Sequence, residues 1–230
     1  MLLAAGRGIR MRPLTDHTPK PLLEVGGKPL IVWHIERLVR ANITDLIINH
    51  AHLGKQLEHH LGDGSRYGAH IQYSAEGEAL ETAGGIAQAR SLLGEEIFAV
   101  VNGDIYCDYD FTRLPACSAR MLRKQDLAHL VLVANPAHHP QGDFALQGSR
   151  VAPASSSPLT TTLTFSGIGL YQPALFNGIV RGSKAPLAPL LRAQITLDKV
   201  SGELHHGAWV DVGTPQRLSE LDAQLRNEHI

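Results

Sequence analysis

Four residues near the N-terminus have the types and the spacing to bind phosphate. Gly6 and Gly8 follow a short apolar run, and Arg10 and Lys20 come next along the chain. Glycines let main-chain N–H groups approach an anion without a Cβ in the way, and successive N–H groups in such a turn form a concave anion site. Arginine adds a planar fork of donors, and lysine adds a compact positive charge. The segment therefore predicts a phosphate-binding loop at the end of a strand.

Two common phosphate-loop patterns do not fit this segment. A Walker A loop ends in Gly-Lys-Ser or Gly-Lys-Thr, whereas this loop continues as Ile-Arg-Met-Arg over 9–12. A dinucleotide fingerprint needs a third glycine where Met11 stands, and Pro13 argues against a helix that starts at the turn. We therefore expect a phosphate loop of another kind, with Lys20 presented on a stiff, extended segment between Pro19 and Pro21.

Asp104 is a second candidate for chemistry, because it stands where the chain leaves an apolar run at 99–103. A carboxylate at such a place is costly without a partner. It could form a turn or cap the next segment. The alternative is a magnesium ligand, since Mg²⁺ takes one or two carboxylates and fills its other positions with water and phosphate. In open α/β sheets, ligands bind beyond the carboxyl ends of the strands. Gly6 and residues 76–81 are expected at the same ends as Asp104, so the interpretation of Asp104 as a magnesium ligand is favoured.

The elements that must position these residues alternate between strand and helix in the first half of the chain. This alternation predicts βαβ crossovers and a mainly parallel sheet that is covered on both faces. The predicted strands span 1–5, 46–49, 71–74 and 97–102, and the predicted helices span 31–42, 55–61 and 82–92, the last capped by Thr82.

The second half of the chain has a different pattern. Strand-like runs follow one another with few helices between them, which predicts an antiparallel or mixed portion of the sheet. A last helix is predicted over 215–226 with Thr214 as its cap. A loop rich in serine and proline is predicted over 153–158. The predicted strands are 127–133, 144–146 and 163–171.

Composition narrows the class of protein. The chain has 230 residues, 43% of them hydrophobic, which suits one sizeable core, and its net charge of −1 predicts no nucleic-acid partner. No apolar run is long enough to span a membrane, and no signal peptide is recognisable, so we expect a cytoplasmic protein. The two cysteines, Cys107 and Cys117, lack metal or redox spacing. The adjacent histidine pairs would point apart on a helix or a strand, which disfavours zinc.

Four segments together resemble the sugar-phosphate nucleotidyltransferases, the enzymes that make nucleotide-diphosphate sugars. They are LAAGRGIRMRPLTDHTPKPLL at 3–23, LETAGG at 80–85, VNGD at 101–104 and WVDVGTP at 209–215, and they span nearly the whole chain. The resemblance implies a three-layer α/β/α sandwich, a Rossmann-like nucleotide-diphospho-sugar transferase fold with a mixed, mainly parallel central sheet. It implies a single domain over 1–230, with a nucleotide-binding half at 1–110 and a sugar-binding half at 111–230. It also implies a longer first strand, so we expect a few residues before Met1.

The resemblance also implies a reaction and a set of residues. A nucleoside triphosphate and a sugar 1-phosphate would be joined with release of pyrophosphate, with Mg²⁺ as cofactor and Asp211 as its second carboxylate ligand beside Asp104. The implied catalytic residues are Arg10, Lys20, Asp104 and Asp211. The implied nucleotide-binding residues are Leu3, Ala4, Ala5, Gly6, Gly8, Arg10, Lys20, Glu76, Glu81 and Thr82. The implied sugar-binding residues are Asn102, Gly142, Asp143 and Ser166.

Details of the pattern bear on the substrates. Glu76 stands where many relatives carry glutamine, and Glu81 stands where glycine is usual. The segments EGEALETAGG, NPAHHPQGDF and TLTFSG most resemble those of bacterial N-acetylmuramate 1-phosphate uridylyltransferases, which implies UTP and a role in peptidoglycan recycling. The alternatives are a mannose or glucose 1-phosphate nucleotidyltransferase that uses GTP, dTTP or UTP, and a non-catalytic regulatory protein that binds nucleotide sugars. Retention of the four implied catalytic residues favours an enzyme. The sequence predicts neither the oligomeric state nor a residue for a lactyl carboxylate.

Overall fold

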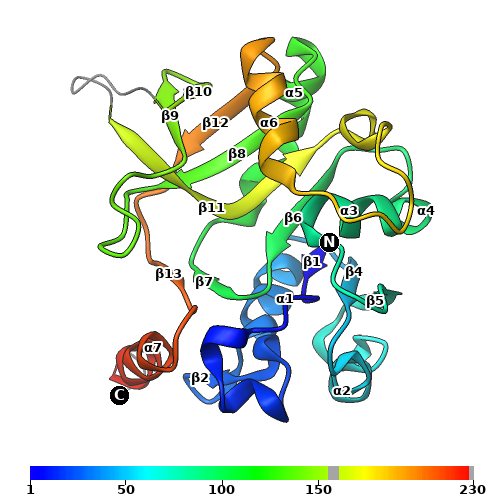
Figure 1. Ribbon diagram of the computed structural model, residues 1–230, viewed down its shortest axis with the longest axis vertical. Coiled ribbons are helices and arrows are strands. Elements are labelled where there is room, and N and C mark those ends of the chain that lie inside the picture. The colour runs from blue at the N-terminus through cyan, green and yellow to red at the C-terminus, as the bar shows by residue number, and fades with distance from the viewer. Residues whose placement is uncertain (155–160, 228–230) are drawn as a thin grey trace.

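The computed structural model describes residues 1–154 and 161–227, and within them a nine-stranded sheet forms the centre of the molecule (Figure 1). The strand order is β5-β4-β1-β6-β11-β8-β12-β10-β9, with a further pairing between β11 and β9. Strands from both halves of the chain therefore share one sheet, and β6 meets β11 at the junction. The strands are β1 (Leu2–Leu3), β4 (Asp45–His50), β5 (His70–Ala75), β6 (Phe98–Asn102), β8 (Ala128–Val133), β9 (Phe144–Gln147), β10 (Arg150–Pro153), β11 (Thr162–Tyr171) and β12 (Val200–Leu204).

The part of the sheet formed by the first half of the chain is parallel, as the alternation of elements predicts. β1 pairs in parallel with β4 on one side and with β6 on the other, and β4 pairs in parallel with β5. At the carboxyl ends of these strands, Leu3 lies between Asn49 and Asn102. The register therefore gathers polar side chains from distant segments at one edge of the sheet.

The part formed by the second half is mixed. β11 runs antiparallel to both β6 and β8, while β12 pairs in parallel with β8. The pairing of β11 with β8 shifts register between Phe165 and Ile168, and Gly167 within this bulge has a φ of +85°. Bulges re-aim side chains and often lie beside functional sites. The predicted mixed central sheet is thus confirmed.

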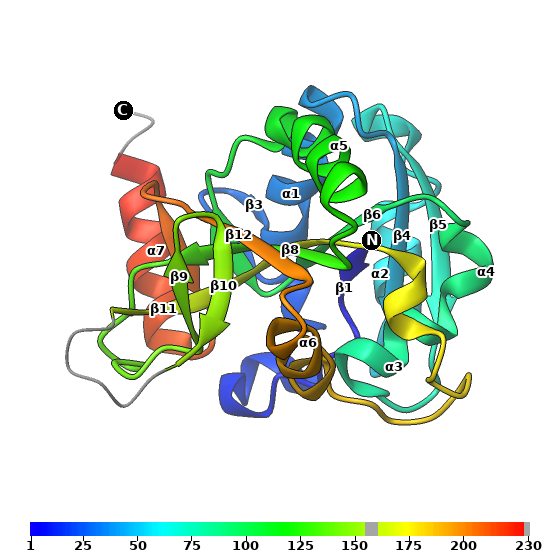
Figure 2. The same ribbon diagram turned by 90° about the horizontal axis from the view of Figure 1, so that it is seen from above.

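Helices cover both faces of the sheet, which gives the expected three layers (Figure 2). On one face, α1 (Leu30–Arg40), α2 (Gly54–Leu61) and α5 (Leu114–Lys124) contribute to one buried apolar cluster. On the other face, α3 (Glu81–Gln88) and α6 (Leu187–Thr196) contribute to a second cluster. The short helix α4 (Arg90–Leu93) follows α3 directly.

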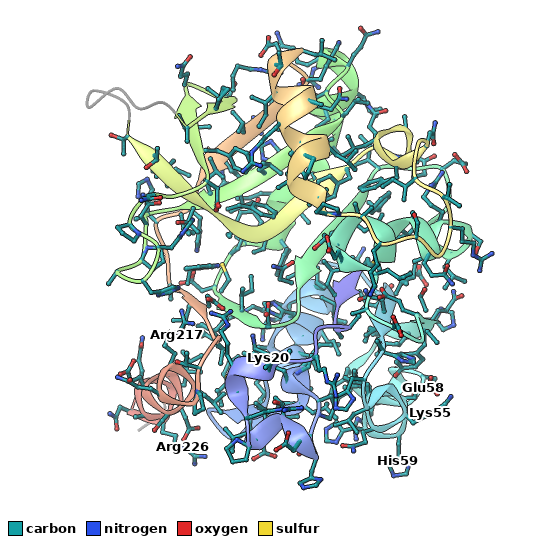
Figure 3. All side chains as sticks on the ribbon, in the orientation of Figure 1. Lys20, Lys55, Glu58, His59, Arg217 and Arg226 are labelled. Atoms are coloured by element: carbon teal, nitrogen blue, oxygen red, sulfur yellow. The ribbon has the colours of Figure 1, made fainter. Side chains whose placement is uncertain are left out.

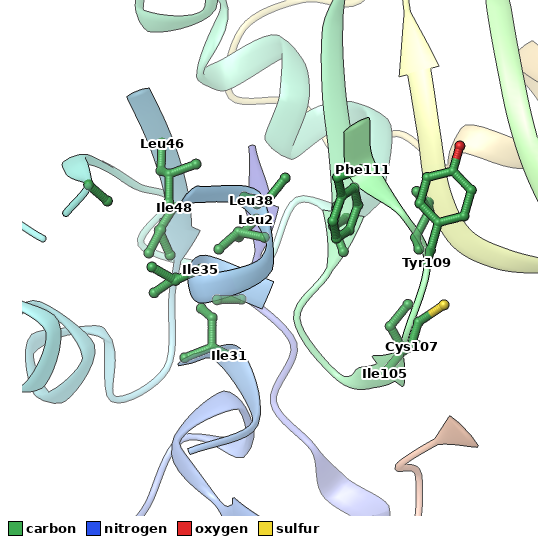
Figure 4. Packing of buried hydrophobic residues seen from close by; sticks show 14 of the residues in the cluster. Leu2, Ile31, Ile35, Leu38, Leu46, Ile48, Ile105, Cys107, Tyr109 and Phe111 are labelled. Atoms are coloured by element: carbon green, nitrogen blue, oxygen red, sulfur yellow. The ribbon is translucent and has the colours of Figure 1, made fainter. Parts of the chain in front are cut away.

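The first cluster shows how the sequence pattern builds this core (Figure 4). Ile31, Ile35 and Leu38 repeat at helical spacing on α1, and all are 2% exposed or less. They pack against Leu2 and Ile48 of the neighbouring parallel strands. Each such buried aliphatic side chain contributes roughly 1.5–3 kcal/mol. The cluster therefore fixes the strands whose carboxyl ends carry the polar residues.

A smaller unit lies beside the sheet. β7 (Ile105–Cys107) pairs antiparallel with β13 (Trp209–Asp211), and the last helix, α7 (Pro215–Asn227), follows β13. α7 docks on the hairpin of β2 (Glu24–Val25) and β3 (Lys28–Pro29), where the Gly26 N–H donates to Asp222 Oδ1 at 2.8 Å. Leu221 and Leu225 of α7 are buried in a third cluster. Helix α7 is thus held against the β2–β3 hairpin near the N-terminus.

Several expectations about individual elements need correction. The predicted helix over 82–92 begins at Glu81 and is interrupted at Ala89, and no side chain caps it, so Thr82 is not its cap. The second half contains the helices α5 and α6, contrary to the expectation of few helices. Thr214 does cap α7, because its hydroxyl accepts from the Arg217 N–H at 3.3 Å. The predicted loop over 153–158 falls mostly on residues 155–160, outside the described residues.

Short 3₁₀ helices occur at Ile9–Met11, Leu14–Asp16, Lys20–Leu22, Ser65–Tyr67, Phe111–Arg113 and Pro173–Phe176. Within residues 1–154 and 161–227, no helix has the length and apolar character needed to cross a membrane.

Candidate active site

Two cavities meet at the carboxyl-end edge of the sheet. The first has a volume of about 410 Å³ and the second about 400 Å³. Arg10, Asn102 and Asp104 line both, so these three residues form a shared wall. The first is lined by Leu3, Ala4, Ala5, Gly6, Arg7, Gly8, Ile9, Arg10, Met11, Lys20, Pro21, Asn49, Glu76, Ala79, Glu81, Thr82, Asn102, Asp104 and Gly213. The second is lined by Arg10, Asn102, Asp104, Ile105, Pro136, His138, His139, Asp143, Thr164, Phe165, Ser166, Trp209 and Asp211.

The predicted phosphate loop forms one side of the first cavity. Gly8 has a φ of +62°, a backbone conformation that favours glycine, and its carbonyl accepts from the Met11 N–H and the Thr15 hydroxyl, both at 2.8 Å. Met11 is fully buried. These contacts fix the turn so that its backbone faces the cavity.

Lys20 lines the first cavity next to the shared wall, although not in the extended conformation that the sequence suggested. It begins the 3₁₀ turn Lys20–Leu22, and its side chain is only 7% exposed. Its Nζ donates to Asp104 Oδ2 at 2.7 Å. The buried ammonium group of Lys20 therefore faces the Asp104 carboxylate rather than solvent.

Asp104 and Asp211 come from segments far apart in sequence, and the β7–β13 pair brings them together. Asp211 lies opposite Ile105, and the Val212 N–H donates to the Asp104 carbonyl at 3.1 Å. On the other side, Nε2 of the fully buried His34 lies 2.7 Å from the Ile105 carbonyl. Burial lowers the pKa of His34 to about 4, so the imidazole is neutral and donates this hydrogen bond. Asp104 directly precedes β7 and Asp211 ends β13. The pairing of these strands and the His34 contact therefore fix both carboxylates in place.

Asp211 has two partners that the sequence did not predict. Its Oδ2 accepts from Arg217 Nη1 at 3.1 Å, and His138 Nε2 lies 3.4 Å from the same oxygen. Arg217 comes from the first turn of α7 and His138 from the loop before β9. Helical arginines usually lie in solvent, so no sequence signal marks Arg217. His138 lies in the segment NPAHHPQGDF of the resemblance, but its contact with Asp211 is not predicted there.

Glu76 and Asn49 form a polar pair at the far end of the first cavity. Asn49 Oδ1 accepts from the Ala4 N–H at 2.9 Å, and its Nδ2 donates to Glu76 Oε1 at 2.5 Å. Glu76 Oε2 accepts from the Leu80 N–H at 2.9 Å. A Cβ on Gly85 would collide with Glu76 Oε1, so the Gly-Gly of the motif lets α3 approach this pair. Asn49 was missed, although a polar residue at the end of the buried run 46–48 is a usable signal.

Glu76 stands where the resemblance implies a glutamine, and its contacts suit a carboxylate. Two donors converge on it, one on each oxygen. A glutamine has only one acceptor oxygen, so it could not accept from both at these positions. Glu81 is a second departure, and it has a φ of +62°. This left-handed conformation suits the glycine that is usual there and costs energy for glutamate.

The predicted sugar residues lie around the second cavity with one exception. Asp143 Oδ2 accepts from the Phe165 N–H at 2.8 Å, and its Oδ1 lies 3.2 Å from His139 Nε2. The Ser166 hydroxyl is buried and accepts from the Ile168 N–H at 3.1 Å. Gly142 is not among the lining residues. A Cβ there would lie 2.6 Å from Asn135 Oδ1, so its role is close packing of the loop.

The fold and the two cavities define a class of enzyme. The family model described as "Nucleotidyl transferase" matches residues 1–228, and the chain belongs to this family. The structure resembles a crystal structure of a putative glucose-1-phosphate thymidylyltransferase from Bacillus anthracis, with a TM-score of 0.83 and 22% identity over 98% of this chain and 94% of that chain. It also resembles an apo UDP-glucose pyrophosphorylase, with a TM-score of 0.77 and 17% identity over 100% of this chain and 98% of that chain.

Curated relatives narrow the class further. The chain is 56% identical to an N-acetylmuramate alpha-1-phosphate uridylyltransferase of Neisseria meningitidis over 97% of this chain and 96% of that protein. It is 32% identical to a protein of the same name from Caulobacter vibrioides over 98% of this chain and 96% of that protein. A mannose-1-phosphate guanyltransferase of Hypocrea jecorina is 40% identical, over 50% of this chain and 32% of that protein.

Proposed function

We propose that this enzyme joins N-acetylmuramate 1-phosphate to UTP and releases pyrophosphate. The observation that carries the proposal is the pair of cavities that share Arg10, Asn102 and Asp104, because nucleotidyl transfer needs two substrates whose phosphates meet at one point. The 56% identity to an uridylyltransferase of this specificity supports the choice of substrates. The expected product is UDP-N-acetylmuramate, a reaction that fits peptidoglycan recycling in the cytoplasm.

The chemistry follows from the chain's own groups. An oxygen of the sugar phosphate attacks the α-phosphorus of UTP in line, and pyrophosphate leaves. A phosphate monoester is already ionised at neutral pH, so no protein nucleophile is needed, and catalysis reduces to positioning and charge stabilisation. Arg10 and the N–H groups of Gly6–Gly8 hold the leaving pyrophosphate. Lys20 lies in the first cavity and is bonded to Asp104 of the shared wall, where it can bridge the two phosphates.

Asp104 and Asp211 fit a magnesium ion by their chemistry and their placement. Each is a carboxylate at the edge of the second cavity, and Mg²⁺ typically takes one or two carboxylates plus substrate phosphate. Each also has a cationic partner, Lys20 and Arg217 respectively, which shows that this region of the protein balances two negative charges. When bound, the ion would neutralise the charge that develops on the phosphates.

The two cavities suggest where the rest of each substrate lies. The base and ribose belong in the first cavity, near the main chain of residues 3–5 and near Glu76, Glu81 and Thr82. Because Glu76 only accepts hydrogen bonds when ionised, it would pair with an N–H of the base, such as the one that uracil offers. The sugar belongs in the second cavity, beside Asn102 and the loop that carries Asp143. This assigns the nucleotide to residues 1–110 and the sugar mainly to 111–230.

A pyrophosphate-release assay over a matrix of substrates tests the proposal. It would cross the four nucleoside triphosphates with the 1-phosphates of N-acetylmuramate, N-acetylglucosamine, mannose and glucose. We expect the highest kcat/KM for UTP with N-acetylmuramate 1-phosphate. A clear preference for GTP with mannose 1-phosphate would replace the proposal, and release with no pair of substrates would indicate a binding protein.

A further inference from the structure

Arg217 is a cation next to the second cavity that the proposed function does not use. Under that function, Arg10 of the shared wall and Lys20 of the first cavity face the phosphates. Arg217 stands apart from them at the base of α7, with its side chain 17% exposed. Its Nη1 contacts Asp211 and His138, and both of these residues line the second cavity. In Figure 3, Arg217 lies on the side of α7 that faces the sheet, and Arg226 lies on the opposite side.

The hydrogen-bonding chemistry of this cluster points to an anion. Arg217 Nη1 lies 2.5 Å from His138 Nε2, and Arg217 Nη1 also donates to Asp211 Oδ2 at 3.1 Å. His138 and Asp211 therefore fix the direction of the guanidinium. Asp211 is the single carboxylate that the described structure gives Arg217 as a partner.

Two guanidinium groups converge beside Gly213. A Cβ on this residue would lie 2.3 Å from Arg217 Nη2 and 3.2 Å from Arg10 Nη2, so both groups approach the bare backbone here. Like charges this close need anions between or beside them. In the described structure Asp211 is the carboxylate beside these two guanidinium groups, so they have donors left for a second anion.

We propose that Arg217, oriented by His138, binds the carboxylate of an acidic sugar 1-phosphate and makes the enzyme select such sugars over neutral ones. This inference rests on the proposed function, in which the sugar occupies the second cavity. N-acetylmuramate differs from N-acetylglucosamine by a lactyl ether that ends in a carboxylate. A guanidinium fork matches the two oxygens of a carboxylate, and such charge-assisted pairs are among the stronger hydrogen bonds.

The test compares the two sugars, since they differ only in the lactyl group. kcat/KM for both 1-phosphates would be measured at saturating UTP and Mg²⁺ for the wild type, Arg217→Gln and Arg217→Lys. Calorimetry would give the Kd of UDP-N-acetylmuramate and UDP-N-acetylglucosamine for the same proteins. Arg226→Gln is the matched control, because it makes the same change on the same helix at a residue that pairs only with Asp222 in the described structure.

We expect Arg217→Gln to lower kcat/KM for N-acetylmuramate 1-phosphate by at least about tenfold more than for N-acetylglucosamine 1-phosphate, and to weaken the binding of the corresponding products in the same ratio. Arg217→Lys should lose part of this selectivity, and Arg226→Gln should lose none. Equal losses on both sugars would overturn the inference in favour of a phosphate or metal role, as would an unchanged preference. A wild type that does not use N-acetylmuramate 1-phosphate would instead reject the proposed function, and this inference with it.

Discussion

The two cavities are built in different ways. The first is lined largely by residues 3–11 and 20–21 near the N-terminus, with the turn at 6–8 on one side. Apart from residues 10 and 102–105, the second is lined by three distant segments: the loop at 136–143, the bulged end of β11 and the strand β13. The first can therefore bind features that all nucleoside triphosphates share, whereas the second can change its specificity by changing side chains. Under the proposed function, the shared wall of Arg10, Asn102 and Asp104 holds the phosphates of both substrates.

The largest expected effect is at Lys20, which is bonded to Asp104 of this shared wall. Lys20→Met removes a buried charge at nearly constant length and should lower kcat by at least about 10²-fold, the usual scale for one electrostatic contact to a transition state. Asp104 is 41% exposed at its side chain, so losing its partner should cost little stability. Stopped assays of the purified variant and its melting curve together measure this. Near-normal turnover in the folded variant would show that Lys20 does not touch the reacting phosphates.

The next effect concerns the two carboxylates. Asp211→Asn keeps the shape of the side chain and removes its charge, so the Mg²⁺ concentration for half-maximal turnover should rise about tenfold or more. Turnover as a function of MgCl₂ measures this, with Asp222→Asn on α7 as the control that should not shift. If Asp211 serves only to hold Arg217, the variant will melt at a lower temperature while its metal response stays that of the wild type.

A substitution confined to the first cavity should change KM for the nucleotide and leave KM for the sugar 1-phosphate nearly unchanged. Asn49→Ala removes the acceptor of the buried Ala4 N–H and the donor to Glu76, so it should cost about 1–3 kcal/mol of stability. It should raise KM for UTP about tenfold and leave KM for the sugar 1-phosphate nearly unchanged. Urea denaturation and initial rates with each substrate varied in turn provide the numbers. A larger change in the sugar KM would contradict the assignment of this cavity.

The smallest effect on activity is expected for His34, which bonds to the Ile105 carbonyl next to Asp104. Burial holds the pKa of His34 near 4, below its ordinary 6.5, so between these values the unfolded chain binds a proton that the native protein does not. Wild-type stability should therefore fall as pH drops from about 6.5 to about 4, by roughly 3 kcal/mol from this residue. His34→Gln can still donate to the Ile105 carbonyl and should lack this part of the pH dependence. Urea denaturation at pH 7 and pH 4.5 would reveal it, and identical pH slopes for both proteins would rule it out.

The contrast between the cavities also explains what the sequence could predict. The turn with Gly6 and Gly8, the polar residues at strand ends and the alternation of strands and helices are local patterns, and they gave the first half of the fold. α6 was missed because Pro186 and Pro189 at its start resemble a loop. α5 was missed because its buried positions are few, namely Leu114, Cys117 and Met121.

Local sequence patterns do not predict contacts between residues that are far apart in the chain. Nothing in the segment around Arg217 marks it as a neighbour of Asp211 and His138, because α7 reaches this position only by docking on the β2–β3 hairpin. The pairing of Lys20 with Asp104 was likewise hidden by the prolines, which suggest an exposed, extended lysine. Sequence alone therefore identified chemical groups more reliably than it identified their partners.

The central claim is that the nucleotide occupies the first cavity and the sugar the second, with their phosphates at the shared wall. A crystal structure with UDP-N-acetylmuramate and Mg²⁺ tests it most directly. We predict uracil beside Glu76, the diphosphate at Arg10, Lys20 and Asp104, and the sugar between Asn102 and the loop at 136–143. Uracil bound against the 164–166 segment of β11, with the sugar at the turn over 6–8, would contradict the account.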